Sequence, residues 1–125
     1  MLKKVMETLI LKNCLTISKG LYDFINNVVK LKYKYSELCN DLIIIIGLFY
    51  EIKNSRRLEI NNPNINQTIK LIEENLVTLD KKLRKNLNLK NKIFKTLTKD
   101  INDKKYQLNL LIKRLKLLLE INKQK

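Results

Sequence analysis

The chain has 125 residues and a formal net charge of +14, and 45% of its residues are hydrophobic, which excludes a disordered tail. Its 2 Gly and 1 Pro are too few for sandwiches and barrels, so we expect one all-α domain over residues 1–125. With 0 His, the chain lacks both the commonest general base and the commonest metal ligand.

The first helix is predicted over residues 2–29, because apolar side chains recur there every three or four positions. These positions are Leu2, Val5, Leu9, Ile17, Leu21, Phe24 and Val28. Gly20 lies inside this helix and costs about 1 kcal/mol relative to Ala, so we expect a close helix contact there.

The second helix is predicted over residues 34–54, with an apolar centre that marks it as the most buried of the set. Its stripe consists of Tyr35, Leu38, Cys39, Leu42, Ile45, Ile46, Phe49 and Ile52. The run Ile43–Ile46 also favours a strand, but the flanking residues keep the helical period. The junction at residues 30–34 holds no helix breaker, so one continuous helix over 2–54 is an alternative.

The clearest interruption of the helical pattern lies between Asn54 and Asn64. Pro63 lacks an amide donor and disfavours helix at the residue before it. Asn64 is therefore the expected N-cap of the next helix, with Gln67 as its reciprocal partner. The third helix is predicted over residues 65–86, where the apolar stripe is unbroken. The stripe consists of Ile65, Ile69, Ile72, Leu76, Leu79 and Leu83.

A short turn over residues 86–91 precedes the fourth helix, which is predicted over residues 92–122. Its apolar positions are Phe94, Leu97, Ile101, Leu108, Leu111, Ile112, Leu115, Leu118 and Leu119. Lys104 and Lys105 interrupt this stripe where a core residue is due, so we expect looser packing there. Four helices joined by short loops predict an antiparallel up-down-up-down four-helix bundle.

The sequence shows no pattern for a catalytic, metal or cofactor site. Cys14, Cys39 and the scattered carboxylates lack zinc spacing, and there is no glycine-rich phosphate loop. We expect both cysteines to be buried free thiols. No secretory signal is present, and the longest apolar run, residues 42–50, is shorter than the ~20 residues of a membrane span. The prediction is a cytoplasmic protein that is not an enzyme.

Residues 81–125 carry 15 Lys/Arg against 3 Asp/Glu, so +12 of the net charge lies in the last part of the chain. An A/T-rich genome would enrich lysine everywhere, but it does not predict this asymmetry. Three interpretations follow: a solvated helix face, an anionic membrane surface, or a nucleic-acid surface. The low number of Arg and the lack of stacking aromatics beside the cluster make nucleic acid the weakest of the three.

The second and fourth predicted helices carry a pattern similar to a known group. Its residues are Lys32, Tyr33, Cys39 and Leu42, then Phe94, Lys95, Lys113, Arg114 and Lys116, with Leu108 and Leu119 bounding the last segment. This pattern resembles the N-terminal bundle of the mixed-lineage-kinase-domain-like pseudokinases of necroptosis, and the related fungal HeLo and plant resistance-protein bundles. The order and lengths of the helices are similar over essentially the whole chain.

The resemblance implies a bundle that binds phosphoinositide-rich membranes through basic residues, oligomerises and permeabilises them. Carried onto this sequence, it implies lipid contact by Lys81, Lys82, Arg84, Lys85, Lys113, Arg114 and Lys116. It also suggests an attached or partner kinase-like or nucleotide-binding domain, although no such region is present in these 125 residues.

The leading hypothesis is therefore a cytoplasmic membrane-targeting bundle of the cell-death type, recruited to anionic lipids. The first alternative is a protein-interaction or oligomerisation bundle without membrane activity, which the unbroken stripe of the third helix favours. The second alternative is a basic helical protein that binds nucleic acid.

Overall fold

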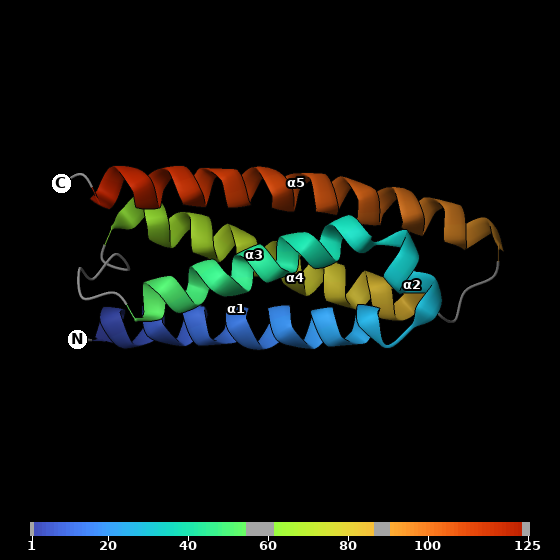
Figure 1. Ribbon diagram of the computed structural model, residues 1–125, viewed down its shortest axis with the longest axis horizontal. Coiled ribbons are helices and arrows are strands. Elements are labelled where there is room, and N and C mark those ends of the chain that lie inside the picture. The colour runs from blue at the N-terminus through green and yellow to red at the C-terminus, as the bar shows by residue number, and fades with distance from the viewer. Residues whose placement is uncertain (1, 55–61, 87–90, 124–125) are drawn as a thin grey trace.

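The computed structural model describes residues 2–54, 62–86 and 91–123, and all side chains in these ranges except those of residues 2–8, 29–30, 86 and 91–97. The described part is helical and contains no strand, which confirms the predicted all-α class. Its helices are α1 (Leu2–Asn26), α2 (Val29–Lys34), α3 (Ser36–Lys53), α4 (Pro63–Asn86) and α5 (Asn91–Lys123) (Figure 1).

The long helices α1, α3, α4 and α5 lie side by side, and the short α2 lies at one end of the molecule (Figure 1). Helix α1 packs against α3 and α4, and α5 packs against α4 and, less extensively, α3. Helix α5 runs back along α4, which brings Lys82 near the end of α4 into an ion pair with Asp100 in the first third of α5. Helices α1 and α5 therefore occupy opposite edges of the molecule.

The junction between the first two predicted helices differs from both expectations. Helix α1 ends at Asn26, and the separate α2 precedes α3, so the alternative of one continuous helix is wrong. The chain turns at Tyr35, whose φ of -117° and ψ of 36° are not helical. The sequence holds no breaker here; the turn lets both Leu31 and Tyr35 enter the core, so tertiary burial overrides helix propensity.

Helix α4 begins two residues before the predicted start because Asn62, and not Asn64, is its N-cap. The Asn62 Oδ1 accepts hydrogen bonds from the backbone N–H groups of Asn64 (2.9 Å) and Ile65 (3.3 Å). Pro63 then occupies the first helical position, where its missing N–H is not needed. The ends of α5 lie within one residue of the predicted 92–122.

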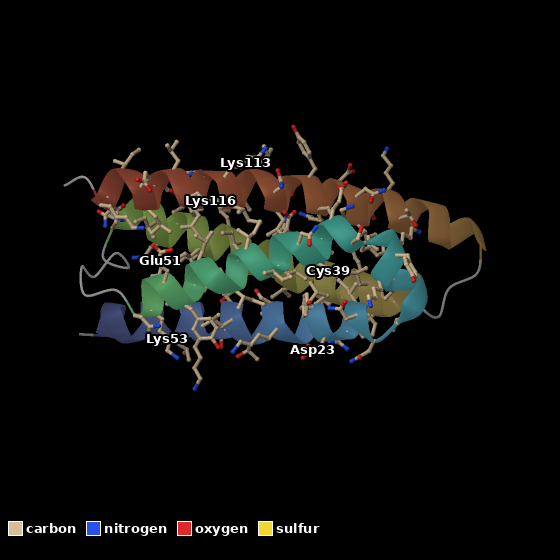
Figure 2. The ribbon with its side chains drawn as sticks, in the orientation of Figure 1. Asp23, Cys39, Glu51, Lys53, Lys113 and Lys116 are labelled. Carbon is tan, nitrogen blue, oxygen red and sulfur yellow. The ribbon has the colours of Figure 1, made fainter. Side chains whose placement is uncertain are left out.

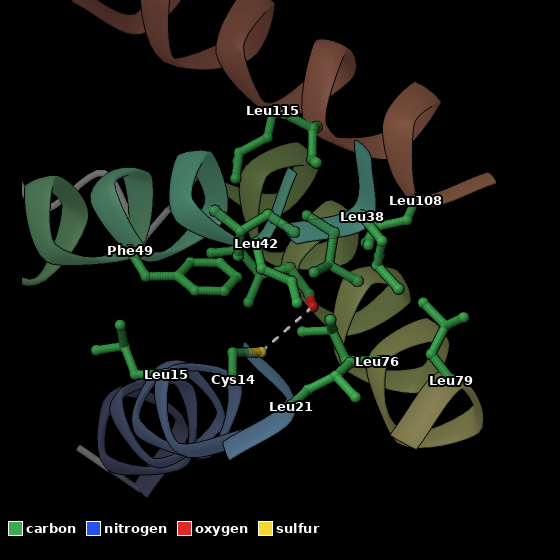
Figure 3. Close-up of a cluster of buried hydrophobic side chains, with 14 of the residues drawn as sticks. Cys14, Leu15, Leu21, Leu38, Leu42, Phe49, Leu76, Leu79, Leu108 and Leu115 are labelled. Carbon is green, nitrogen blue, oxygen red and sulfur yellow. Dashed lines mark hydrogen bonds between the residues drawn. The ribbon is translucent and has the colours of Figure 1, made fainter. Parts of the chain in front are cut away.

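The core is built from the predicted stripes of α3, α4 and α5, part of which Figure 3 shows. All six predicted positions of α4 are buried, as are all those of α3 except the half-buried Ile46. Among the predicted α5 positions, Phe94 and Leu97 lie outside the described side chains. Not every residue of the apolar centre of α3 enters the core, because Ile43 and Ile44 face solvent.

The predicted stripe of α1 is confirmed at Leu21, which is buried, but it is wrong nearer the start of the helix. Leu9 is exposed, whereas Leu11, Cys14 and Leu15 face the core. The helix carries apolar residues around more than half of its circumference, so periodicity alone does not define its buried side. The predicted members Leu2 and Val5 lie outside the described side chains.

Both glycines face open space, since no atom beyond the adjacent residues and the nearby backbone of the same helix lies within 4 Å of the position of an added Cβ. The close contact expected at Gly20 is therefore wrong. Because Ala has the higher helix propensity, Gly20→Ala and Gly47→Ala should each raise the free energy of unfolding by about 1 kcal/mol. Urea denaturation measures this change. A loss of stability in either variant would show that its added methyl group meets an obstacle.

Candidate functional site

The basic cluster at the end of α4 is partly used inside the fold. Lys82 pairs with Asp100 of α5, with 3.0 Å between Nζ and Oδ2. Arg84 pairs with Asp80 at 3.1 Å, and its guanidinium lies 4.6 Å from the centroid of the Phe24 ring of α1. These two cations therefore join α4 to its two neighbours.

The other two members of this cluster face solvent. Lys81 and Lys85 are exposed, and the structure gives neither an ion pair with any described residue. Cations of this kind are available to an external phosphate. The predicted cluster of four thus contains two structural and two available charges.

The predicted cations of α5 are all exposed but face different directions. Lys113 acts electrostatically on Asp41 of α3, whereas Arg114 lines a groove shared with α4. Figure 2 shows Lys113 and Lys116 on α5, on the edge of the molecule away from α1. The outer half of α5 is therefore basic along both of its flanks.

The structure does not bring the two sets of cations into one cluster. Lys82 is level with Asp100, and Arg114 follows Asp100 by about four helical turns, or about 21 Å. The α4 cluster lies near the α2 end of the molecule, and the α5 cations lie towards the other end. They form two basic patches along the same pair of helices.

A polar groove of about 500 Å³ separates α3 from α5 beside the interrupted stripe. Its lining consists of Glu37, Asn40, Asp41, Asn102, Lys105, Tyr106 and Asn109. The half-buried Lys105 takes the place of a core residue, with its Nζ 5.7 Å from the centroid of the buried Tyr35 ring. The lysine stem can pack on apolar surface while its ammonium group interacts with the ring.

Asp41 is the titratable group most affected by this groove. Burial raises the pKa of Asp41, although the hydrogen bond from Asn109 Nδ2 (3.3 Å) lowers it. The charge of Glu37 raises the same pKa, and those of Lys105 and Lys113 lower it. The net effect is a carboxyl group whose ionised form is disfavoured by folding.

The Asp41→Asn variant should therefore be more stable than the wild type at neutral pH. A raised folded-state pKa contributes stability that is fully present below the unfolded pKa of about 3.9 and is lost as pH rises through the folded value. The advantage of Asn should thus shrink as the pH falls towards that range. Thermal unfolding across acidic to neutral pH measures it, and a variant less stable at neutral pH would contradict the direction.

A set of exposed apolar residues on α5 was not predicted from the sequence. Tyr106, Leu110, Leu117 and Ile121, called here the outer stripe, are 67%, 47%, 62% and 46% exposed. They follow one another at helical spacing on the side of α5 away from its core residues, with Lys113 and Arg114 between them. Spacings of four and seven would have revealed a second apolar face beside the first.

A second groove, of about 610 Å³, lies between α4 and α5 and borders the outer stripe. Leu71 of α4 and Leu110 and Leu111 of α5 contribute its apolar part, and Arg114 lies on the same wall. Asn75, which is buried, also lines it, and its Oδ1 has no hydrogen-bond partner. The apolar surface of α5 therefore continues towards α4.

Neither cysteine has the features of an activated nucleophile. Both cysteines are buried free thiols, as predicted. Burial, with a smaller effect from the Glu73 charge, raises the pKa of Cys14 to about 12, and its Sγ donates to the Ile69 carbonyl oxygen at 3.9 Å (Figure 3). Burial also raises the pKa of Cys39. Thiols in this state are poor nucleophiles.

Within the described ranges, no three potential metal ligands among Cys, Asp and Glu come together. None of the described helices combines the length and the hydropathy that crossing a membrane requires. Comparison of the chain with protein-family models, curated proteins and solved structures found no match. The resemblance to the cell-death bundles therefore stays a prediction.

Proposed function

We propose that this protein binds the anionic surface of membranes through the basic end of α4 and the basic outer half of α5. The observation that carries the proposal is the exposure of Lys81, Lys85, Lys113 and Lys116 on two adjacent helices. Helix α5 alone has nine Lys/Arg against three Asp/Glu. Each such lysine near anionic lipid contributes about 1 kcal/mol of attraction.

The finer parts of the proposal derive from the resemblance and from the helix contacts. We propose an up-down-up-down four-helix bundle in which α2 is a short insertion between the first two long helices. We further propose that the protein is cytoplasmic before recruitment, prefers phosphoinositides, and oligomerises on the membrane to permeabilise it. Release of a dye enclosed in phosphoinositide-containing vesicles tests the last step.

Vesicle flotation tests the binding itself. The protein should float with phosphatidylcholine vesicles that contain phosphatidylserine or a phosphoinositide, and should remain at the bottom with phosphatidylcholine alone. Equal recovery with anionic and neutral vesicles would overturn the proposal, because the exposed lysines would then have no part in the interaction.

Nucleic-acid binding is the second candidate, favoured by two exposed aromatic rings. Tyr33 lies between Lys32 and Lys34 in α2, and Tyr106 follows Lys105 in α5. Exposed rings beside lysines can stack on bases while the ammonium groups contact phosphates. A titration with single-stranded RNA that shows no binding even at low ionic strength would remove this candidate.

A protein-interaction or oligomerisation bundle is the third candidate. The exposed Ile43 and Ile44 on α3, beside the uncovered Gly47, favour it. If the protein sediments as a monomer at high concentration, the hypothesis that the bundle oligomerises with itself is contradicted.

A further inference from the structure

Helix α5 has two apolar faces, and only one of them is used by the core. Its inner face consists of Ile101, Leu108, Ile112, Leu115 and Leu119, all of which are buried. Its outer stripe consists of Tyr106, Leu110, Leu117 and Ile121, all of which are exposed. Single exposed apolar residues are common on protein surfaces, but four along one side of one helix form an apolar patch of the kind that marks an interaction site.

The outer stripe is long enough for α5 to lie with its axis parallel to a membrane surface. From Tyr106 to Ile121 it extends over about four turns, or about 22 Å. Lys113 and Arg114 stand within it, and Lys116 lies beside it. A helix with aliphatic residues on one side and cations among and beside them is typical of segments that lie in the headgroup region of a bilayer.

The charge of α5 favours an anionic bilayer over a second copy of the chain. Two α5 helices packed on each other would place their excess cations together, which is unfavourable. Nucleic-acid phosphates would pair with the cations but would leave the aliphatic side chains in contact with polar groups. In a bilayer, the lysines can contact anionic headgroups while the outer stripe contacts hydrocarbon. Both contacts are possible at once, because long cationic side chains reach back to the headgroup level.

We infer that the outer stripe of α5 enters the boundary between headgroups and hydrocarbon of an anionic membrane while the core remains closed. This inference rests on the proposed membrane binding and names the face that makes it. The inner face of α5 stays in the core throughout, so contact by the outer stripe exposes no buried residue. Helix α1, at the opposite edge of the molecule, faces water in this orientation.

Tryptophan substitution gives a direct test, because the chain contains 0 Trp. Leu117→Trp places a single tryptophan, excited selectively over the tyrosines, in the outer stripe, and Asn13→Trp places a matched tryptophan on the exposed side of α1. With phosphatidylcholine–phosphatidylserine vesicles, the first should shift to the blue and be quenched by lipids brominated on their acyl chains. The second should keep its emission. Quenching at position 13, or flotation of the protein without quenching at position 117, would overturn the inference.

The same experiment separates this inference from the proposed function. Loss of flotation with anionic vesicles would overturn membrane binding altogether, whereas flotation without quenching would overturn only the role of the stripe. Leu117→Asn should weaken vesicle partitioning about tenfold, because it removes an aliphatic side chain from hydrocarbon. Leu9→Asn, which alters an exposed leucine of α1, should leave partitioning unchanged. Equal effects of the two substitutions would also overturn the inference.

The two native cysteines report on whether the core stays closed. Cys14 and Cys39 are both buried, so a thiol reagent should label neither in the closed fold. Vesicle-bound protein should remain as resistant to the reagent as protein without vesicles. Rapid labelling of either thiol on the membrane would show that the helices separate, and would overturn binding as a closed body.

Discussion

Replacement of Ile45 by Ala is expected to lower the free energy of unfolding by about 2 to 5 kcal/mol, the range for truncating a buried isoleucine. Ile45 is 0% exposed and faces the core from α3. Its truncation removes apolar contacts and leaves a cavity that close-packed neighbours fill only in part. Urea denaturation of the wild type and the variant measures the loss.

The neighbouring Ile43 provides the matched control. It is 52% exposed, and Ala has the higher helix propensity, so Ile43→Ala should change stability by no more than about 0.5 kcal/mol. In a strand, residues 43 and 45 would point to the same face, and the two substitutions would have similar effects. Similar losses would thus contradict the helical assignment of the isoleucine run.

Reversal of Lys113 and Lys116 to Glu should weaken binding to anionic vesicles roughly 30-fold or more, since two attractions of about 1 kcal/mol each are lost. Lys81 and Lys85 form a second pair, and their reversal should have a comparable effect if both patches contact the membrane. Lys82 and Arg84 are poorer choices, because a glutamate at either position would meet Asp100 or Asp80. Flotation over a range of lipid concentrations gives the affinities.

A control with the same change in net charge separates contact from general attraction. Lys12 is exposed on α1, and Figure 2 shows Lys53 at the α1 side of the molecule. Their joint reversal to Glu should reduce vesicle binding much less than reversal of Lys113 and Lys116. Circular dichroism should show the same helix content in all variants. Equal losses of binding would mean that net charge alone attracts the protein to lipid.

The buried side of a helix could be predicted from the sequence where its apolar stripe is narrow, and less well where its apolar residues cover a wide arc. Helix α4 has one narrow stripe, so its buried apolar residues follow from periodicity, although its first residue and its buried Thr68 and Asn75 do not. Helix α1 has apolar residues on a wider arc, and only contact with α3 and α4 selects Cys14 and Leu15 for the core. The turn at Tyr35 has no local signal, because it is burial of Leu31 and Tyr35 against the other helices that accompanies it.

Some features of the candidate site could likewise be predicted from the sequence, and others could not. Charge asymmetry along the chain identified the basic helices, and the exposure of Lys81, Lys85, Lys113 and Lys116 agrees with their availability. The pairing of Lys82 with Asp100 joins residues of different helices, so residue spacing along the chain could not distinguish it from its exposed neighbours. The outer stripe has the spacing of a helix face, but spacing alone does not distinguish an exposed apolar face from a buried one.

The short helix α2 covers one end of the core. Leu31 of α2 and Tyr35 at its end are buried across the end of the molecule where α1 finishes and α3 begins. Lys34 adds a hydrogen bond from its Nζ to Thr98 Oγ1 of α5, at 3.3 Å. Backbone amides near Tyr35 should therefore exchange their hydrogens late.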